Sequence, residues 1–196
     1  MLPTIFCLVP AGADPRVLGA LAEVGVAGFQ VRAKGLTDAS LLQFTGTVID
    51  AVRPQGATVV VNDRVDVALA AGADGVHLGR DDLPVATARR LAPGLIVGAT
   101  CRDRAQAEAA ARDGADYAGF GPVFATSSKT GLPAPLGLDA ITTAAGPLPL
   151  VAIGGIEAAT ARAARDAGAH GVAVIGAIWR QRDPVAAAKE LVEAVA

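Results

Sequence analysis

One short pattern recurs along the chain: an Ala-rich stretch, a Gly, and then a short apolar run. Residues 68–79 read ALAAGADGVHLG, residues 111–121 read ARDGADYAGFG, and residues 165–176 read RDAGAHGVAVIG. Residues 21–32, LAEVGVAGFQVR, form a weaker copy. The Ala-rich part is typical of a helix end, Gly ends the helix because it accepts positive φ, and the apolar run is typical of a buried strand. The chain is therefore predicted to repeat a helix–strand unit.

Extending this pattern gives a regular alternation over the whole chain. The apolar runs are residues 5–9, 27–31, 57–61, 75–78, 95–99, 117–120, 150–153 and 171–175, and the helical patterns are residues 15–24, 38–53, 65–71, 84–91, 104–113, 137–145, 157–167 and 183–195. Such alternation predicts parallel strands with right-handed crossovers, and eight units favour a closed (β/α)8 TIM barrel. An open doubly wound α/β sheet is the alternative. No linker divides the chain, so residues 1–196 are predicted to form a single domain.

Composition limits the classes of function and location. Hydrophobic residues make up 52% of the chain and aromatic residues 4%, as in α/β proteins with buried parallel strands. The net charge of −2 gives no basis for broad nucleic-acid binding. Cys7 and Cys101 lack the spacing of a zinc site, and no structural disulfide is expected. With neither a signal peptide nor a long apolar run, we expect a soluble, cytoplasmic protein that binds no membrane.

Polar side chains follow the predicted strands, at the barrel end where active sites lie. Around the end of the second run, Gln30, Arg32 and Lys34 alternate and so project to one side of an extended chain. Two cations there suit a diphosphate, with Arg supplying a planar fork and Lys a point charge. The alternative is a solvated loop without function.

Two carboxylates stand after neighbouring predicted strands. Asn62 and Asp63 follow the third run, and Asp82 follows the fourth. Two carboxylates would repel a diphosphate unless a cation lay between them, and Mg²⁺ takes few carboxylates and completes its shell with water and phosphate oxygens. We therefore expect Asp63 and Asp82 to bind Mg²⁺. The alternative for each is a helix N-cap. His77, within the fourth run, is assigned no chemical step.

The remaining strand ends carry groups that suit phosphate. Thr100 follows the fifth run, and the loop at 121–131 carries four hydroxyls and a Lys, all able to donate to phosphate oxygens. We expect this loop to act as a mobile lid. Gly155 and Gly176 follow the last two runs, where such barrels bind phosphate through backbone amides. The barrel mouth is therefore predicted to hold two phosphorylated substrates side by side.

Four blocks of sequence resemble the signatures of the thiamine-phosphate synthase family. They are QVRAK, VNDRVDVALAAGADGVHLGRDDLP, GADYAGFGPVFATSSKTG and VAIGGI, and they appear in the family's order over most of the chain. The resemblance implies a transferase of thiamine biosynthesis that joins hydroxymethylpyrimidine diphosphate to hydroxyethylthiazole phosphate, giving thiamine phosphate and pyrophosphate. It also implies a dissociative course, in which the diphosphate leaves before the thiazole nitrogen attacks.

The resemblance assigns roles by position. It implies that Arg32, Lys34 and Lys129 are catalytic, and that Asp63 and Asp82 bind the implied cofactor, Mg²⁺. The residues implied to contact the substrates are Gln30, Arg32, Lys34, Asn62, Thr100, Thr126, Ser128, Lys129, Gly155, Ile175 and Gly176. Gln30 would touch the pyrimidine, and the last three residues would surround the thiazole phosphate.

The chain departs from the family pattern at several positions. Gln commonly stands in place of Arg80, Ser in place of Gly176, and Tyr near Cys7, so that Cys7 would remove an aromatic surface from the pyrimidine pocket. Gly176 keeps a backbone N–H but loses a hydroxyl. The sequence leaves open whether the thiazole carries an extra carboxylate and which oligomer forms, with a homodimer as one alternative.

Three rival functions share parts of this pattern. A related thiazole tautomerase would need an acid–base group, but Pro122 stands where its histidine is expected. A non-catalytic binder of thiamine precursors would keep the phosphate sites and not need the carboxylates. A phosphate-binding isomerase or epimerase would need a base–acid pair, which only His77 and an Asp could supply.

Overall fold

The computed structural model describes residues 1–128, 131 and 133–196, and these form a closed parallel barrel. In this part of the chain the strands are β1 (Ile5–Val9), β2 (Gly28–Val31), β3 (Thr58–Asn62), β4 (Gly75–Leu78), β5 (Ile96–Cys101), β6 (Tyr117–Phe120), β7 (Leu150–Ile153) and β8 (Gly171–Val174). They pair in chain order, and β8 closes on β1 through Phe6 opposite Ala173. This closure confirms the predicted (β/α)8 barrel over the open sheet.

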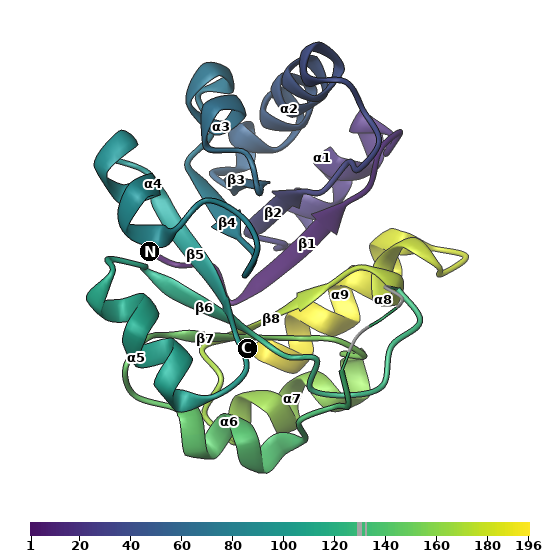
Figure 1. The fold of residues 1–196 in the computed structure, drawn as a ribbon. Helices are drawn as coiled ribbons and strands as arrows, with labels where there is room; N and C mark the ends of the chain where they lie inside the picture. Colours follow the sequence, from purple (N-terminus) through teal and green to yellow (C-terminus); the bar gives the residue numbers. More distant parts are fainter. Residues whose placement is uncertain (129–130, 132) are drawn as a thin grey trace.

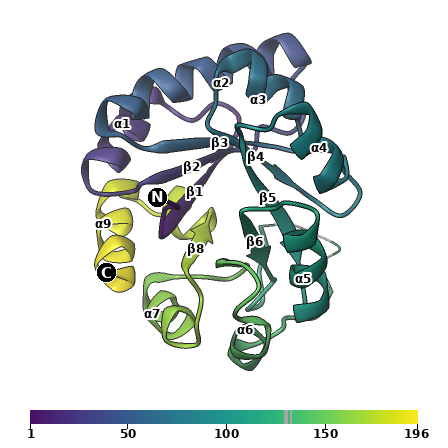
Figure 2. The same ribbon diagram turned by 90° about the vertical axis from the view of Figure 1, so that its left-hand side faces the viewer.

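The helices surround the barrel as an outer ring, as Figures 1 and 2 show. Their bounds are α1 (Pro15–Glu23), α2 (Asp38–Val52), α3 (Val65–Ala71), α4 (Val85–Leu91), α5 (Arg104–Arg112), α6 (Leu138–Ala144), α7 (Ala158–Asp166), α8 (Gly176–Trp179) and α9 (Pro184–Val195), with a 3-10 turn, η1, at Arg53–Gln55. The predicted elements agree with these bounds to within a few residues. Two short elements of the described chain, α8 and the 3-10 turn, are not predicted from the sequence. No helix among the described residues is long and apolar enough to span a membrane.

The strands are buried on both faces because each face meets a different apolar layer. Inside the barrel, Phe6, Leu8, Val60, Tyr117 and Val151 belong to one cluster. The alternate strand residues face outward and join the much larger cluster between the barrel and its helices. Because successive side chains of a strand point to opposite faces, the residues of each strand lie alternately in the lumen and in the outer layer.

The repeated Gly-Ala-Asp motif has a structural task at the amino ends of the strands. Asp74, just before β4, accepts a hydrogen bond from the Val59 N–H of β3 at 2.7 Å. Asp116, just before β6, accepts one from the Val97 N–H of β5, also at 2.7 Å. In the third copy His170 replaces the Asp, but its backbone N–H still donates to the Leu150 carbonyl of β7. The motif thus ties each strand to the one before it, on the face opposite the predicted active site.

Replacing Asp116 with Ala should destabilise the barrel without changing its chemistry. The carboxylate accepts from the Val97 N–H and pairs with Arg89 at 2.6 Å, so its loss leaves that backbone donor without its acceptor. It also removes the counter-charge of Arg89, whose guanidinium keeps its hydrogen bonds to backbone carbonyls. We expect the free energy of unfolding to fall by about 1–2 kcal/mol in urea titrations. Asp113→Ala is the matched control, because Asp113 is exposed and no side-chain hydrogen bond of Asp113 is found within the described residues. Equal stability of the two variants would contradict this role.

Candidate active site

Two adjoining pockets open at the carboxyl ends of the strands. The first, here called the carboxylate pocket, has a volume of about 360 Å³, and its lining includes Gln30, Arg32, Lys34, Asn62, Asp63, His77, Asp82, Thr100 and Tyr117. The second, called the glycine pocket, has a volume of about 270 Å³, and its lining includes Arg32, Thr126, Ser127, Ser128, Gly154, Gly155, Ile175, Gly176 and Arg180. Arg32 is the charged residue that lines both, so it stands between the two pockets.

The alternation predicted at the end of β2 places three polar side chains in one pocket. Gln30 is buried in the lumen and donates through Nε2 to Oδ1 of Asn62 at 2.9 Å. Arg32 lies further out along the strand direction and Lys34 further still, where its side chain is exposed. The carboxylate pocket therefore has a fixed amide pair near its base and two cations toward its rim.

Asp63 and Asp82 meet in the same pocket. Burial, together with the neighbouring carboxylate of Asp82, raises the pKa of Asp63 to about 6, against the opposing effect of Lys34 and Arg32. The ammonium nitrogen of Lys34 lies 4.0 Å from Oδ2 of Asp63. Two carboxylates are thus held together at a cost, and Lys34 offsets only part of it.

Neither carboxylate is a helix cap, which corrects the alternative hypothesis for both. The N-cap of α3 is Arg64, and that of α4 is Pro84. Asp63 instead adopts a left-handed backbone conformation with φ of +67°, which is uncommon for a residue with a side chain. Asp82 accepts from the Gly79 N–H at 2.7 Å and so closes the turn after β4. The fold places both side chains toward the pocket rather than along a helix axis.

The donor set of this pocket fits magnesium. Among the described residues no group of three or more His, Cys, Asp and Glu side chains is placed to hold one metal ion, as a zinc site would require. Magnesium needs fewer protein ligands, since one or two carboxylates suffice when water and phosphate oxygens complete its octahedron. A divalent cation between Asp63 and Asp82 would also remove the repulsion that raises the pKa of Asp63.

His77 lies deeper in the carboxylate pocket, where both ring nitrogens are engaged. Nδ1 lies 3.1 Å from the Tyr117 hydroxyl, and Nε2 lies 3.1 Å from the Thr100 hydroxyl. Burial lowers the pKa of His77 to about 4, although the Asp82 carboxylate acts in the opposite direction. His77 is therefore neutral near pH 7 and a weak base, which disfavours an isomerase or epimerase built on it.

The glycine pocket is shaped by Gly154 and Gly155, at the end of β7. Both have left-handed φ values, +95° and +65°. A Cβ at Gly154 would lie 2.5 Å from the Pro122 side chain, and one at Gly155 would lie 2.4 Å from the Ala125 carbonyl oxygen. The backbone after β6 therefore packs directly on this turn, which only glycine permits. The two segments also pair through the Phe124 N–H and the Gly154 carbonyl at 2.9 Å.

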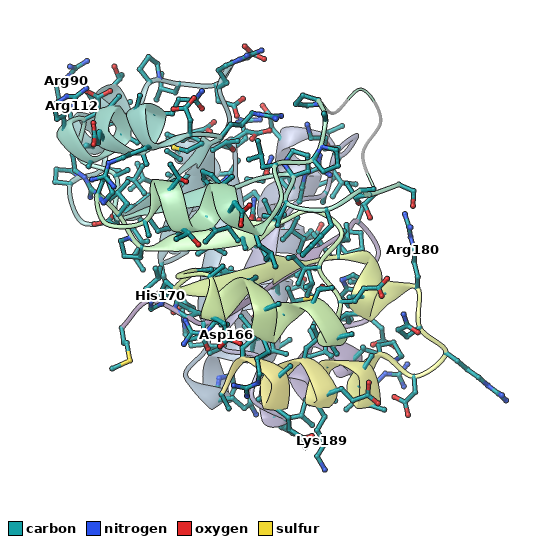
Figure 3. All side chains as sticks on the ribbon, turned by 90° about the horizontal axis from the view of Figure 1, so that it is seen from below. Arg90, Arg112, Asp166, His170, Arg180 and Lys189 are labelled. Carbon is teal, nitrogen blue, oxygen red and sulfur yellow. The ribbon has the colours of Figure 1, made fainter. Side chains whose placement is uncertain are left out.

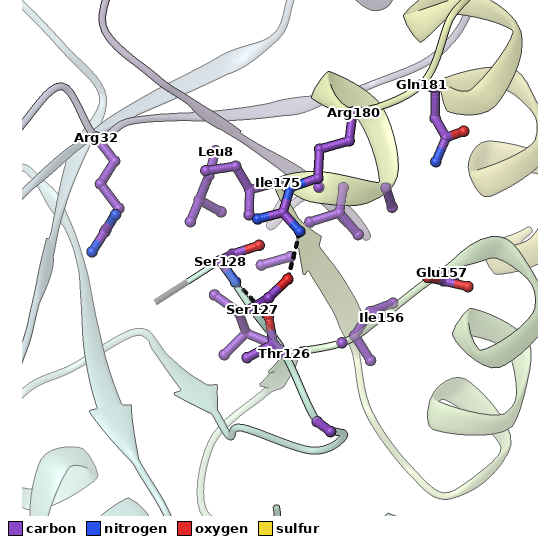
Figure 4. Close-up of a pocket in the computed structure, with 18 residues that line it drawn as sticks. Leu8, Arg32, Thr126, Ser127, Ser128, Ile156, Glu157, Ile175, Arg180 and Gln181 are labelled. Atoms are coloured by element: carbon purple, nitrogen blue, oxygen red, sulfur yellow. Dashed lines mark hydrogen bonds between the residues drawn. The ribbon is translucent and has the colours of Figure 1, made fainter. Parts of the chain in front are cut away.

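Hydroxyl groups from the loop after β6 complete the glycine pocket (Figure 4). Thr126 and Ser128 both line it as predicted, and the Thr126 hydroxyl accepts from the Ser128 N–H at 3.2 Å. Ser127, to which the sequence assigned no role, accepts from Nη1 of Arg180 at 2.7 Å. Lys129, predicted to be catalytic, lies outside the described residues.

Two residues of the mouth were missed from the sequence. Arg180 follows α8, which is too short to give a helical pattern in the sequence, although such barrels often carry a short extra helix after the eighth strand. Tyr117 was missed because it reads as an ordinary buried strand residue. Its inward direction follows from the same alternation that places Gly119 in the lumen.

The expectation for Cys7 is wrong. Cys7 is fully buried in the outer cluster between barrel and helices, and burial raises the pKa of its thiol to about 12. Its neighbours Phe6 and Leu8 are the β1 residues that face the lumen. Aromatic surface in the carboxylate pocket comes from Phe6 and Tyr117, so Cys7 removes none. Arg80, another departure, lines the rim of that pocket with an exposed side chain.

Comparison with known proteins points to one family. The family model of thiamine monophosphate synthase matches residues 6–178. A thiamine-phosphate synthase from Methanoculleus marisnigri is 47% identical over 183 residues, which cover 90% of this chain and 87% of that protein. A thiamine biosynthesis bifunctional protein from Symbiobacterium thermophilum is 46% identical over 98% of this chain, which spans only 41% of that longer protein.

A solved structure agrees with the sequence comparison. The thiamine phosphate pyrophosphorylase from Pyrococcus furiosus superposes with a TM-score of 0.89 and 33% sequence identity. The match covers 98% of this chain and 95% of that one, so the likeness extends over the whole barrel and its mouth.

Proposed function

The chain belongs to the thiamine monophosphate synthase family and functions as a thiamine-phosphate synthase, a transferase of thiamine biosynthesis, and we propose that it works with one Mg²⁺ held by Asp63 and Asp82. The observation that carries this proposal is the position of Arg32. Arg32 lines both the carboxylate pocket and the glycine pocket, so its guanidinium can contact two phosphorylated substrates at once.

The proposed arrangement puts the pyrimidine diphosphate in the carboxylate pocket. Gln30 and Asn62 offer a fixed amide pair for the pyrimidine end, and Arg32 and Lys34 face the diphosphate. When bound, Mg²⁺ supplies further positive charge to the diphosphate oxygens. The thiazole phosphate then occupies the glycine pocket, where Gly155, Ile175 and Gly176 surround its phosphate.

In the proposed reaction the protein must stabilise the diphosphate as a leaving group. The bond between the pyrimidine methylene carbon and the diphosphate oxygen breaks, and both electrons leave on the diphosphate. The lone pair of the thiazole nitrogen then forms the new carbon–nitrogen bond. Arg32 and Lys34, with Lys129 as a third cation predicted from the sequence, stabilise the charge that grows on the diphosphate. Attack by this nitrogen releases no proton, so the proposed course needs no general base.

The residues of the barrel mouth distinguish two of the rival functions from the synthase. A tautomerase needs an acid–base group at the thiazole, whereas Pro122 is buried beneath the turn at Gly154 and offers none. A non-catalytic binder of the precursors has no need of Asp63 and Asp82 in contact. The carboxylate pair therefore favours the synthase over both.

The proposal predicts pyrophosphate release that depends on both substrates and on magnesium. Purified protein mixed with both substrates should release pyrophosphate and thiamine phosphate in equal amounts, and chelation should remove nearly all of this activity until Mg²⁺ is added back. A coupled pyrophosphate assay with a separate assay for thiamine phosphate measures both products. Tight binding of both substrates without any release would support the binder instead. Full turnover in the chelator would contradict the metal proposal alone.

A further inference from the structure

Three side chains form a hydrogen-bonded chain in the lumen of the barrel. Tyr117, at the start of β6, is 2% exposed and lies 3.1 Å from Nδ1 of His77 on β4. Nε2 of His77 lies 3.1 Å from Oγ1 of Thr100, which is exposed at the end of β5. These hydrogen bonds therefore run from the buried floor of the carboxylate pocket toward its opening.

Glycines on the facing strands make room for the two rings. A Cβ at Gly98 would lie 2.1 Å from Cζ of Tyr117, and a Cβ at Gly119 would lie 2.6 Å from Cε1 of His77. Phe6 stacks on the Tyr117 ring, with centroids 5.6 Å apart and an interplanar angle of 15°. The rings are thus held in place by their surroundings, and the direction of the Tyr117 hydroxyl is fixed toward the histidine.

The direction of these hydrogen bonds follows from the donors available. A neutral imidazole has one N–H donor and one acceptor nitrogen. In the described part of the chain His77 is the hydrogen-bond partner found for the Tyr117 hydroxyl, which is buried. If Nδ1 carried the proton, the phenol proton would lose that acceptor, which is costly for a buried group. Tyr117 therefore donates to Nδ1, and Nε2–H donates to Thr100.

We propose that Tyr117 and His77 are positioning residues that fix the Thr100 hydroxyl as a hydrogen-bond donor toward the diphosphate. With one lone pair of Oγ1 occupied by Nε2–H, the hydroxyl proton of Thr100 is free to point into the pocket. The opposite tautomer would accept that proton and leave only lone pairs facing an anion. The identity of the anion rests on the proposed function, whereas the tautomer does not.

The tautomer can be observed directly in the free protein. The chain contains only two histidines, so ¹⁵N-histidine labelling gives two ring spin systems, and the His77→Gln variant identifies one of them. We expect His77 to carry its proton on Nε2, and Tyr117→Phe to raise the fraction protonated on Nδ1. Phe6→Leu is the control, because it alters the packing against Tyr117 and keeps the hydroxyl. A wild-type Nδ1–H tautomer would overturn the proposal.

Kinetics test whether Tyr117 and His77 act through the Thr100 hydroxyl. Thr100→Val should lower kcat/KM for the diphosphate substrate about 10- to 100-fold, and Thr100→Ser should restore most of it. Tyr117→Phe should cost about 3- to 10-fold in the wild type and almost nothing in the Thr100→Val background, since coupled residues are non-additive. The same loss in both backgrounds would contradict the proposal that Tyr117 acts through Thr100. Wild-type protein without any turnover would instead count against the proposed function.

A separate observation concerns Arg180, which follows α8 at the glycine pocket. Its Nη1 donates to the Ser127 hydroxyl at 2.7 Å, and Figure 4 shows the side chain reaching from α8 toward that loop. A Cβ at Gly176 would lie 3.3 Å from Cδ and 3.4 Å from Nε of Arg180. The long side chain therefore lies over Gly176, in the lining of the glycine pocket.

We infer that Arg180 binds the phosphate of the thiazole substrate in the glycine pocket. A guanidinium carries several N–H donors in a planar fork, so one can bond Ser127 while others meet phosphate oxygens. Among the described residues that line this pocket, Arg180 adds a second cation beside Arg32. This inference rests on the proposed function of the glycine pocket.

Discrimination between phosphorylated and unphosphorylated thiazole tests Arg180. Arg180→Ala should raise KM for hydroxyethylthiazole phosphate about 10- to 100-fold and leave kcat/KM for hydroxyethylthiazole alcohol unchanged. Arg182→Ala is the control, because Arg182 is exposed on the same connection but lines a different groove. Equal losses with both thiazoles, or none, would rule out phosphate binding by Arg180. A wild-type protein that showed no preference for the phosphate would contradict the function of the pocket itself.

Discussion

Replacing Asp82 with Asn lowers kcat/KM by about 10²- to 10³-fold and leaves the barrel folded: this is one of the two largest effects we expect. The Asn side chain keeps an oxygen that can accept from the Gly79 N–H, so the turn after β4 is retained. What is lost is one of the two negative charges that would hold Mg²⁺ against the diphosphate. The loss should therefore fall mainly on metal affinity and on kcat.

Asp81→Asn is the matched control for Asp82. Asp81 is the adjacent carboxylate, its side chain is exposed, and its nearest cation is the equally exposed Arg80 at 3.7 Å. Calorimetric titration of Mg²⁺ into protein with a bound non-reactive diphosphate analogue should show weaker binding for Asp82→Asn than for Asp81→Asn. Unchanged turnover and unchanged Mg²⁺ affinity in Asp82→Asn would remove this residue from the proposed metal site.

The barrel could be predicted because its signal is local and repeated. Each copy of the Gly-Ala-Asp motif ends a helix and begins a buried strand, and these strands meet in chain order. The grouping of Arg32, Asp63 and Asp82 also followed, because all carboxyl ends of parallel strands share one face of the barrel. The left-handed conformation of Asp63 beside Asp82, by contrast, is indicated by no sequence pattern.

The wrong expectation at Cys7 shows where such reasoning ends. In a strand a shift of one residue exchanges the lumen for the outer layer, so a position matched only to its vicinity can be placed on the wrong face. Phe6 and Leu8 face the pocket, and Cys7 between them does not. The role inferred for Arg180 was hidden for a different reason, since α8 is too short to produce a helical period.

Changes at Arg32 should give a loss of similar size with a different signature. Arg32 lines both pockets, so its removal weakens the hold on the diphosphate and on the second substrate together. We expect Arg32→Ala to lower kcat/KM by about 10²- to 10³-fold and to raise KM for both substrates. The kcat/KM of Arg32→Lys should lie between those of the wild type and of Arg32→Ala. Lys keeps the charge but loses the planar fork that can bridge two anions.

The comparison with a remote arginine separates this role from a general effect of charge. Arg112 ends α5 on the outer ring, and it lies far from Arg180 and the mouth in Figure 3. Arg112→Ala changes the net charge by the same amount and should leave both KM values unchanged. Steady-state kinetics with each substrate varied in turn measures the two KM values independently. If Arg32→Ala raised KM for one substrate only, Arg32 would belong to one pocket, and the meeting of two phosphorylated substrates at this residue would be wrong.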